Sequence, residues 1–565
     1  MKIFEPISRF FDKKLVLLTM VCVATAFILF GNSLNGTYTL DDNDVLNNRE
    51  ILRSIKSFPK IFTSTWQPDE PWAGTYRPLT LLSFAINFIF LESTFGLHFV
   101  NVLLQALNVF LIYGVVSKFT SKRIACLSAL LFMFLPIHVE SVASIVGRKE
   151  LLGLFFVLLS LWWFFDKKYF LSSSAFLLAL LANDFSISLL PLTGFLLLIQ
   201  SGSFARAFKT GFYYIMPLPV YFLLRYLALG RYAFGGGSID PVMNPLMYVS
   251  LKERVFTAFS HLYLYIQKTF YPLTLSPDYS FNQVPIIKNI LTSRQAMLGL
   301  LFFAGLLLLF VVSRKDFKII LALFMVPYLV MSNIFFATSG TLAERYWYLP
   351  SFGLSVLTAF GFDKILGYGQ KLKPYAYALG VVILIGYSFL IIKQNRIWLN
   401  NRNLFVHAAE KSPNSVWARA NLAAVYIEEE QFNEAREEVN AALAIYDKHP
   451  PTLNILGKLN WRDKKYQEAE EAFKQAIEFD KNGRNRRSLN RSLAFLNLDL
   501  GKNQQAFLYM EEAVKWPSPR SSQRIVKIDE VLYKTVKKYK ERRVSSYTKE
   551  ESAEVTSLIR GVRGF

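Results

Sequence analysis

Two adjacent carboxylates, Asp41 and Asp42, are the first candidates for chemistry, because they follow the first apolar segment, Leu15–Phe30, directly. A membrane protein that does chemistry at one face of the bilayer needs a general base at about this depth. Partial desolvation and nearby charge can tune the pKa of a carboxylate there. Together with Asp44, the pair could also supply oxygen ligands to a divalent metal, although no spacing demands one. The alternative is a solvated turn, since Asp and Asn favour turns.

Other charged residues interrupt or border the later apolar runs. A charge in the apolar layer costs roughly 2.5–3.5 kcal/mol, so such residues usually line a cavity or form pairs. Any single one could instead be a snorkelling or helix-end residue. On the predicted topology they share the membrane face of Asp41, and they are Arg77, His138, Glu140, Arg148, Lys149, Glu150, Asp184, Glu344 and Arg345.

The elements that must position these residues are membrane helices. Of the 565 residues 53% are hydrophobic and only 19% are charged, which excludes an ordinary soluble protein. The formal charge is +21, but the basic residues of the first two-thirds lie in short loops between apolar runs. This is the positive-inside pattern, so nucleic acid is not an expected partner. Cys22 and Cys126 lie inside apolar runs and offer neither a disulfide framework nor a metal site.

About eleven spans are predicted, and the first is interpreted as an uncleaved signal anchor with its N-terminus in the cytoplasm. Leu79–Leu91 and Phe256–Phe270 are expected to be interfacial or re-entrant helices. A twelve-span alternative would move the C-terminal part to the cytoplasmic side. The ten later spans are Phe99–Val116, Ile124–Leu135, Leu151–Phe165, Tyr169–Ala182, Ser188–Ile199, Gly211–Leu229, Met297–Val312, Ile319–Met331, Trp347–Phe362 and Tyr375–Ile392.

A 34-residue repeat follows the last apolar run. Leu422, Ala423, Ala435 and Ala442 recur at the same offset as Leu456, Gly457, Ala469 and Ala476, and a third copy with offset 37 has Leu493, Ala494, Ala506 and Ala513. This period with small residues is typical of tetratricopeptide repeats, whose paired helices stack into a solenoid with a concave, peptide-binding surface. The repeats could instead only stabilise or oligomerise the protein. The sequence thus predicts an all-α chain with a transmembrane domain (residues 1–395), a repeat domain (396–516) and a basic tail (517–565).

A set of motifs recurs in order along the chain: Asp41-Asp42, Tyr76-Arg77-Pro78-Leu79, the run 98–104, the runs 136–143 and 146–152, Asn244-Pro245, Ser276-Pro277-Asp278-Tyr279-Ser280, Ala343-Glu344-Arg345 and Tyr348-Leu349-Pro350-Ser351. This ordered set resembles the transmembrane and tetratricopeptide-repeat-containing O-mannosyltransferases and their bacterial relatives. The likeness covers nearly all of the membrane part and the repeats. One departure is Asn183-Asp184, where the family often has Lys-Glu.

The resemblance implies a GT-C type, inverting glycosyltransferase that moves a sugar from a polyprenyl-phosphate donor to a protein Ser or Thr on the lumenal or periplasmic side. In that mechanism Asp41 or Asp42 is the base, and three cations, Arg148, Lys149 and Arg345, hold the donor phosphate. The remaining charged residues have supporting or acceptor-binding roles. No cofactor beyond the lipid-linked sugar is required, although a divalent metal is possible.

Three alternatives remain open. The first is a non-catalytic membrane scaffold whose repeats assemble partner proteins, and the second is the same chemistry on a lipid or glycan acceptor. The third is a retaining mechanism with two carboxylates. The short loops favour a bacterial inner membrane with periplasmic repeats over an endoplasmic reticulum membrane with lumenal repeats.

Overall fold

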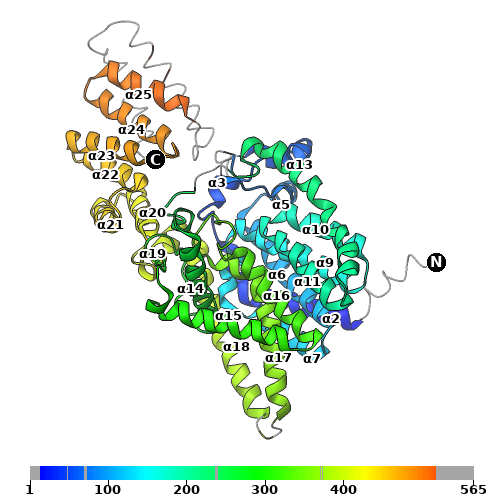
Figure 1. The fold of residues 1–565 in the computed structure, drawn as a ribbon. Coiled ribbons are helices and arrows are strands. Elements are labelled where there is room, and N and C mark those ends of the chain that lie inside the picture. The colour runs from blue at the N-terminus through cyan, green and yellow to red at the C-terminus, as the bar shows by residue number, and fades with distance from the viewer. Residues whose placement is uncertain are drawn as a thin grey trace.

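The computed structural model describes residues 13–46, 49–68, 73–235, 239–368, 371, 373–516, 533 and 537. Every regular element in these ranges is an α-helix or a 3₁₀ turn, so the all-α prediction is confirmed for the described part of the chain (Figure 1). The predicted basic tail falls outside the described residues apart from Tyr533 and Lys537.

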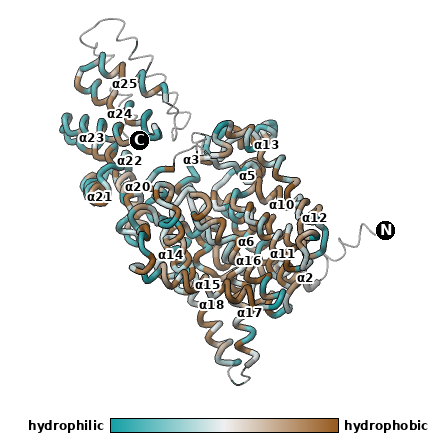
Figure 2. Tube along the Cα trace, viewed as in Figure 1, coloured by the Kyte–Doolittle hydropathy of each residue, from teal (hydrophilic) through white to brown (hydrophobic). Residues whose placement is uncertain are grey.

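The first part of the chain folds into a bundle of apolar helices with short helices and turns at one end (Figures 1 and 2). Its elements are α2 (Lys13–Phe30), α3 (Asp42–Leu46), α5 (Pro78–Phe90), α6 (Thr94–Val116), α7 (Lys122–Met133), η5 (Pro136–His138), α8 (Val139–Ala143), η6 (Ile145–Gly147), α9 (Arg148–Phe165), α10 (Tyr169–Ala182), η7 (Asp184–Ser188), α11 (Leu189–Ser201), α12 (Phe204–Ile215), α13 (Pro217–Leu229), α14 (Leu251–Phe270), α15 (Arg294–Val312), α16 (Lys315–Met331), η11 (Glu344–Trp347), α17 (Tyr348–Tyr368) and α18 (Lys373–Asn395).

Seven helical segments of the described chain are long and apolar enough to cross a membrane, or eight if the bent pair α7 and η5–α8 forms one span. The eleven segments predicted from the sequence all fall on helices, but four do not qualify alone. Helix α7 has 12 residues and qualifies only as part of the bent pair. Helix α10 has 14 residues, α16 has 17, and α9 begins with three charged residues. The two apolar helices expected not to span, α5 and α14, are also outside the seven.

Close backbone approaches hold the bundle together at glycines. A Cβ on Gly353 of α17 would lie 2.4 Å from the backbone of Leu323 in α16. A Cβ on Gly299 of α15 would lie 1.9 Å from the carbonyl oxygen of Phe259 in α14. Small residues allow such contact, which is a main source of helix association where lipid replaces water.

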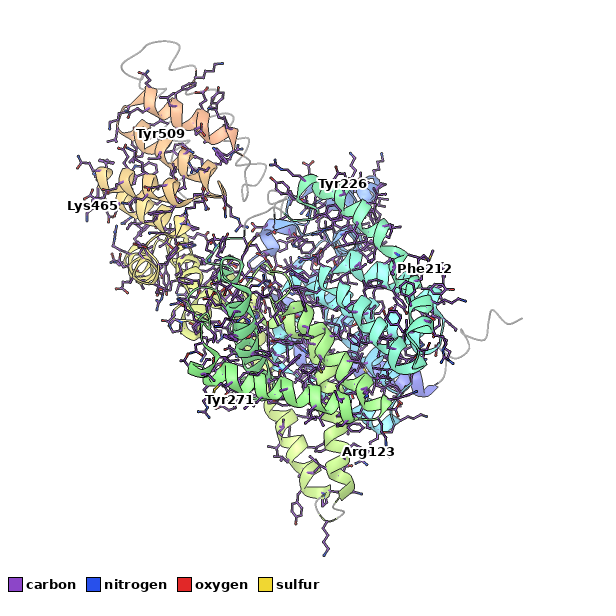
Figure 3. The ribbon with its side chains drawn as sticks, viewed as in Figure 1. Arg123, Phe212, Tyr226, Tyr271, Lys465 and Tyr509 are labelled. Atoms are coloured by element: carbon purple, nitrogen blue, oxygen red, sulfur yellow. The ribbon has the colours of Figure 1, made fainter. Side chains whose placement is uncertain are left out.

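Ion pairs gather the predicted cytoplasmic loops at one end of the bundle. Lys118 Nζ lies 2.6 Å from Asp166, and Arg123 Nε lies 3.2 Å from Asp363. Figure 3 shows Arg123 near the α17–α18 hairpin, which projects from the end of the bundle away from α3. The loops that carry Asp41 and its expected partners meet at the other end.

The repeat region is a row of helix pairs: α20 (Val416–Glu428) with α21 (Phe432–Ile445), α22 (Pro450–Arg462) with α23 (Tyr466–Phe479), and α24 (Arg486–Asp499) with α25 (Asn503–Lys515). It is joined to α18 through η13 (Arg396–Leu399) and α19 (Asn401–Lys411). The small residues of the repeat are buried between paired helices, and a Cβ on Gly457 would lie 2.5 Å from the ring of Phe473. The row leaves the bundle at the end where α3 lies (Figure 1).

Candidate functional site

The two adjacent aspartates have different environments. Asp42 is fully buried, and it accepts hydrogen bonds from the backbone N–H of Thr39 (2.9 Å) and of Val146 (2.8 Å) and from the Thr39 hydroxyl (3.2 Å). Burial raises the pKa of Asp42 to about 7. Both of its oxygens are therefore occupied in joining the loop before α3 to η6.

Asp41 is the available carboxylate. Its side chain is exposed and makes no hydrogen bond or ion pair with another described residue. It interacts electrostatically with Lys149 and Arg345. A pKa near neutrality suits a general base, but access to the reacting proton comes first. The geometry therefore favours Asp41 over Asp42 as the base.

Arg345 and Lys149 are each paired with a buried carboxylate, Arg345 with Glu140 of a neighbouring element and Lys149 with Glu150 of its own helix. The Arg345 guanidinium in η11 forms an ion pair with Glu140 of α8, and the Arg345 backbone N–H donates to the other Glu140 oxygen at 2.8 Å. The Arg345 side chain keeps 22% of its surface exposed, whereas Glu140 keeps 3%. Lys149 Nζ lies 4.0 Å from Glu150 and 5.8 Å from the centre of the Trp66 ring. These contacts fix the two positive charges at the mouth of the site.

A small pocket lies directly behind these cations. Its volume is about 10 Å³, room for about one water molecule, and it is lined by Glu150, Arg345, Asn183 and Ser186 together with apolar side chains of η7, α9, α16 and α17. The Glu150 side chain is 4% exposed, and neither of its oxygens accepts a hydrogen bond from a described residue. Buried carboxylates are normally hydrogen-bonded, so this one is available to a hydroxyl or a water molecule.

Arg148, predicted to bind phosphate, is hydrogen-bonded to oxygen atoms inside the protein core. It is fully buried and donates four hydrogen bonds, to the side-chain oxygens of Asn101 (2.9 Å) and Asn87 (3.0 Å) and to the carbonyls of Leu97 (2.7 Å) and Ser83 (3.3 Å). Neighbouring positions on a helix point about 100° apart, so Arg148 faces α5 and α6 while Lys149 faces the site.

Arg148→Lys is expected to lower the free energy of unfolding by about 1–3 kcal/mol, because an ammonium group cannot replace the planar fork and leaves an acceptor unpaired. Thermal unfolding in nanodiscs measures this loss. The KM for a polyprenyl-phosphate sugar should stay within about twofold of the wild-type value. If Arg148→Lys raised the donor KM and left the melting temperature unchanged, Arg148 would be assigned to phosphate binding.

Two other predicted site residues also lie away from Asp41. His138 is fully buried, with Nε2 2.8 Å from the Ser351 hydroxyl and its ring 4.3 Å from that of Phe132, so it belongs to the core. Glu344 accepts hydrogen bonds from the Ser276 backbone N–H and the Tyr279 hydroxyl, so its side chain points into the 275–280 loop. His138 and Glu344 are close in sequence to the paired residues Glu140 and Arg345, but their own side chains contact other parts of the protein.

No group of three or more His, Cys, Asp or Glu side chains in the described chain is placed to hold a metal ion. Both Asp42 oxygens already accept hydrogen bonds from Thr39 and Val146. The arrangement at Asp41 consists of one exposed acid, two cations held by buried acids, and a pocket.

The chain is similar to known proteins in both its repeat region and its membrane part. Residues 414–482 match the tetratricopeptide repeat family. Protein O-mannosyl-transferase TMTC4 of Mus musculus is 26% identical over 69% of this chain and 61% of its own length. Protein O-mannosyl-transferase TMTC1 of Homo sapiens is also 26% identical, over 76% of this chain and 55% of its own length. The chain is a distant relative of the TMTC protein O-mannosyl-transferases. The resemblance found in the sequence is thus confirmed.

The chain spans between 55% and 61% of the length of these two TMTC relatives. Among solved structures, the crystal structure of the Archaeoglobus fulgidus oligosaccharyltransferase with a tethered acceptor peptide overlaps 76% of this chain and 59% of its own. That overlap has 13% sequence identity and a TM-score of 0.36.

Asp184, at the departure from the TMTC pattern, is paired with Arg77 and with an arginine that the sequence analysis missed, Arg225. Asp184 accepts from Arg77 Nε (3.1 Å), from Arg225 (2.8 Å) and from the Tyr221 hydroxyl (3.1 Å). Arg225 is the one charged residue inside the predicted span Gly211–Leu229. The cost of a charge in an apolar run was the signal that could have found it.

Proposed function

We propose that the chain is an inverting glycosyltransferase that moves a sugar from a polyprenyl-phosphate donor to a Ser or Thr hydroxyl of a protein. The observation that carries this proposal is the exposed Asp41 carboxylate at the end of the bundle from which the repeats extend, in a loop that Asp42 bonds to Val146, three residues before Lys149. The relation to protein O-mannosyl-transferases supports the reaction class and the protein acceptor.

The proposed reaction is a single displacement at the anomeric carbon. The acceptor hydroxyl oxygen attacks that carbon, its proton passes to Asp41, and the bond from carbon to the phosphate oxygen breaks with its electrons on the phosphate. Because the leaving group is already anionic, it needs charge stabilisation more than a proton. Lys149 and Arg345 supply positive charge that is fixed before the reaction, and Arg77 adds to their field.

Glu150 is the proposed contact for the sugar. Its oxygens are buried in the pocket without a donor, and a sugar hydroxyl can supply one. Asn183 and Ser186 line the same small pocket and add polar atoms beside Glu150. The polyprenyl chain would then lie outside the bundle, in the lipid.

The proposed architecture has eleven spans in residues 1–395, repeats in 396–516 and a tail in 517–565. The site and repeats face away from the cytoplasm, either in a bacterial periplasm or in an endoplasmic reticulum lumen. Two observations support a common side for them: basic loops pair at the far end of the bundle, and the loop before Asp41 bonds directly to the start of the repeat region.

The test uses the full chain in nanodiscs with undecaprenyl- or dolichyl-phosphate mannose and a panel of Ser/Thr-rich protein acceptors. We expect a mass gain of one hexose on a Ser or Thr, read by mass spectrometry. A hexose found on lipid or glycan would keep the chemistry and change the acceptor. If neither donor is consumed while the protein is folded, the scaffold alternative is favoured.

A further inference from the structure

The loop that ends at Asp41 is bonded to the start of the repeat region. The Thr37 backbone N–H and hydroxyl both donate to the carbonyl of Leu399, at 2.9 and 3.0 Å. The Leu40 backbone N–H donates to the side-chain oxygen of Asn401 at 3.1 Å. Asn401 is the first residue of α19, so three hydrogen bonds join the two regions across more than 350 residues of chain.

Leu40 is also a side-chain contact between the two regions. It packs against the apolar cluster formed between α19 and α20, which contains Phe405, Ala409, Leu422 and Val425. It packs against the core of the bundle as well. The residue that directly precedes the proposed base thus sits at the junction of the bundle and the repeats.

The backbone of Leu40 indicates that this contact is held in place. Its φ is +48°, in the left-handed region, which costs a residue with a Cβ roughly 1–2 kcal/mol. Such a conformation persists only where the surroundings stabilise it. Here the Asn401 hydrogen bond and the apolar cluster provide that stabilisation, and they orient the peptide unit that leads into Asp41.

A second loop holds the same helices from the other side. The Asp278 carboxylate accepts from the hydroxyls of Ser415, at the start of α20, and of Ser280. The Ser412 hydroxyl donates to the Asp278 carbonyl at 2.6 Å. In the same loop the Ser276 N–H donates to Glu344, the neighbour of Arg345, at 2.7 Å. Two sets of contacts therefore start at α19–α20. One reaches Leu40, the residue before Asp41, and the other reaches Glu344, the residue before Arg345.

We infer that α19 and α20 are a positioning element of the transferase site, with Leu40 and Asn401 as positioning residues for Asp41. This inference rests on the proposed function. The repeats would then do more than bind an acceptor: their first helices set the orientation of the base. A change at α19 should act on the rate of the chemical step rather than on donor binding.

The test compares Asn401→Ala with Asn403→Ala in the full chain in nanodiscs. Asn403 lies on the same helix, is exposed, and its side-chain amide donates only to the Arg396 carbonyl (3.2 Å). For Asn401→Ala we expect kcat with undecaprenyl- or dolichyl-phosphate mannose to fall at least tenfold while the donor KM stays within twofold. Asn403→Ala should match the wild type. A wild-type kcat in folded Asn401→Ala would overturn the inference and leave the proposed function standing.

Leu40 supplies a second variant pair. Leu40→Gly tolerates a positive φ but loses the packing of the side chain, so kcat should fall. Leu40→Met keeps the packing, so most of the wild-type kcat should remain. A readout independent of transfer is hydrogen exchange of the amides in residues 38–46. It should rise about tenfold in Asn401→Ala and stay unchanged in Asn403→Ala. If wild-type protein shows no transfer, the proposed function fails by itself, and unchanged exchange in Asn401→Ala would then overturn the structural coupling too.

Discussion

Asp41→Asn is expected to lower kcat for sugar transfer by about 10²–10⁴-fold, the range for loss of a general base. The melting temperature should not fall, because the exposed Asp41 side chain makes no hydrogen bond within the described chain. The donor KM should change little, since the cations that face the phosphate keep their partners. Transfer assays and thermal unfolding on the same nanodisc preparation measure both quantities.

Asp42→Asn is the matched control for this prediction. Asp42 presents one oxygen to the Thr39 N–H and the other to the Val146 N–H, and an amide can replace only one of them. The free energy of unfolding should therefore fall by about 1–3 kcal/mol. If Asp42→Asn stops transfer at an unchanged melting temperature while Asp41→Asn stays active, Asp42 is the base and the assignment is reversed.

Arg345→Gln is expected to reduce transfer about 10²–10³-fold and to destabilise the protein. The loss of transfer follows from removing fixed positive charge from the leaving phosphate. The loss of stability follows because Glu140, only 3% exposed, would keep its charge without a partner. Breaking a buried pair in this way costs about 3–5 kcal/mol, and the partial exposure of Arg345 places the expected value at the lower end.

The double variant Arg345→Gln with Glu140→Gln separates the two effects. It removes both charges together, so most of the lost stability should return while transfer stays low. Recovery of transfer in the double variant would mean that Arg345 serves only to hold Glu140. That outcome would leave Lys149 as the main phosphate contact.

The repeat region was predictable because its signal is local. Helix pairing at a 34-residue period needs small residues at set positions, and Ala423, Ala435, Gly457 and Ala469 occupy them. The order of apolar runs likewise predicts the helices of the bundle. The structure has seven helical segments in its described part that meet the length and apolarity of a span, or eight with the bent pair, because α7, α9, α10 and α16 are short or charged at one end.

The candidate site was predictable as a set of residues but not as an arrangement. The cost of a charge in an apolar layer singled out Arg77, Lys149, Glu150 and Arg345, which the structure brings to one end of the bundle. The same rule also selected Arg148, which is a structural cross-link. Arg225, in the middle of a predicted span, satisfies the same rule and is paired with Asp184.

What the sequence by itself determined is the inventory: membrane helices, repeats, and charges that must be paired or line a cavity. Burial energy and helix periodicity act over a few residues, so they can be seen in the chain. Only the tertiary structure separates the exposed Asp41 from the buried Asp42, and shows that Arg148 is hydrogen-bonded within the core. Neighbouring side chains point in different directions, and their surroundings come from segments distant in the chain, such as Val146 for Asp42 and Asn401 for Leu40.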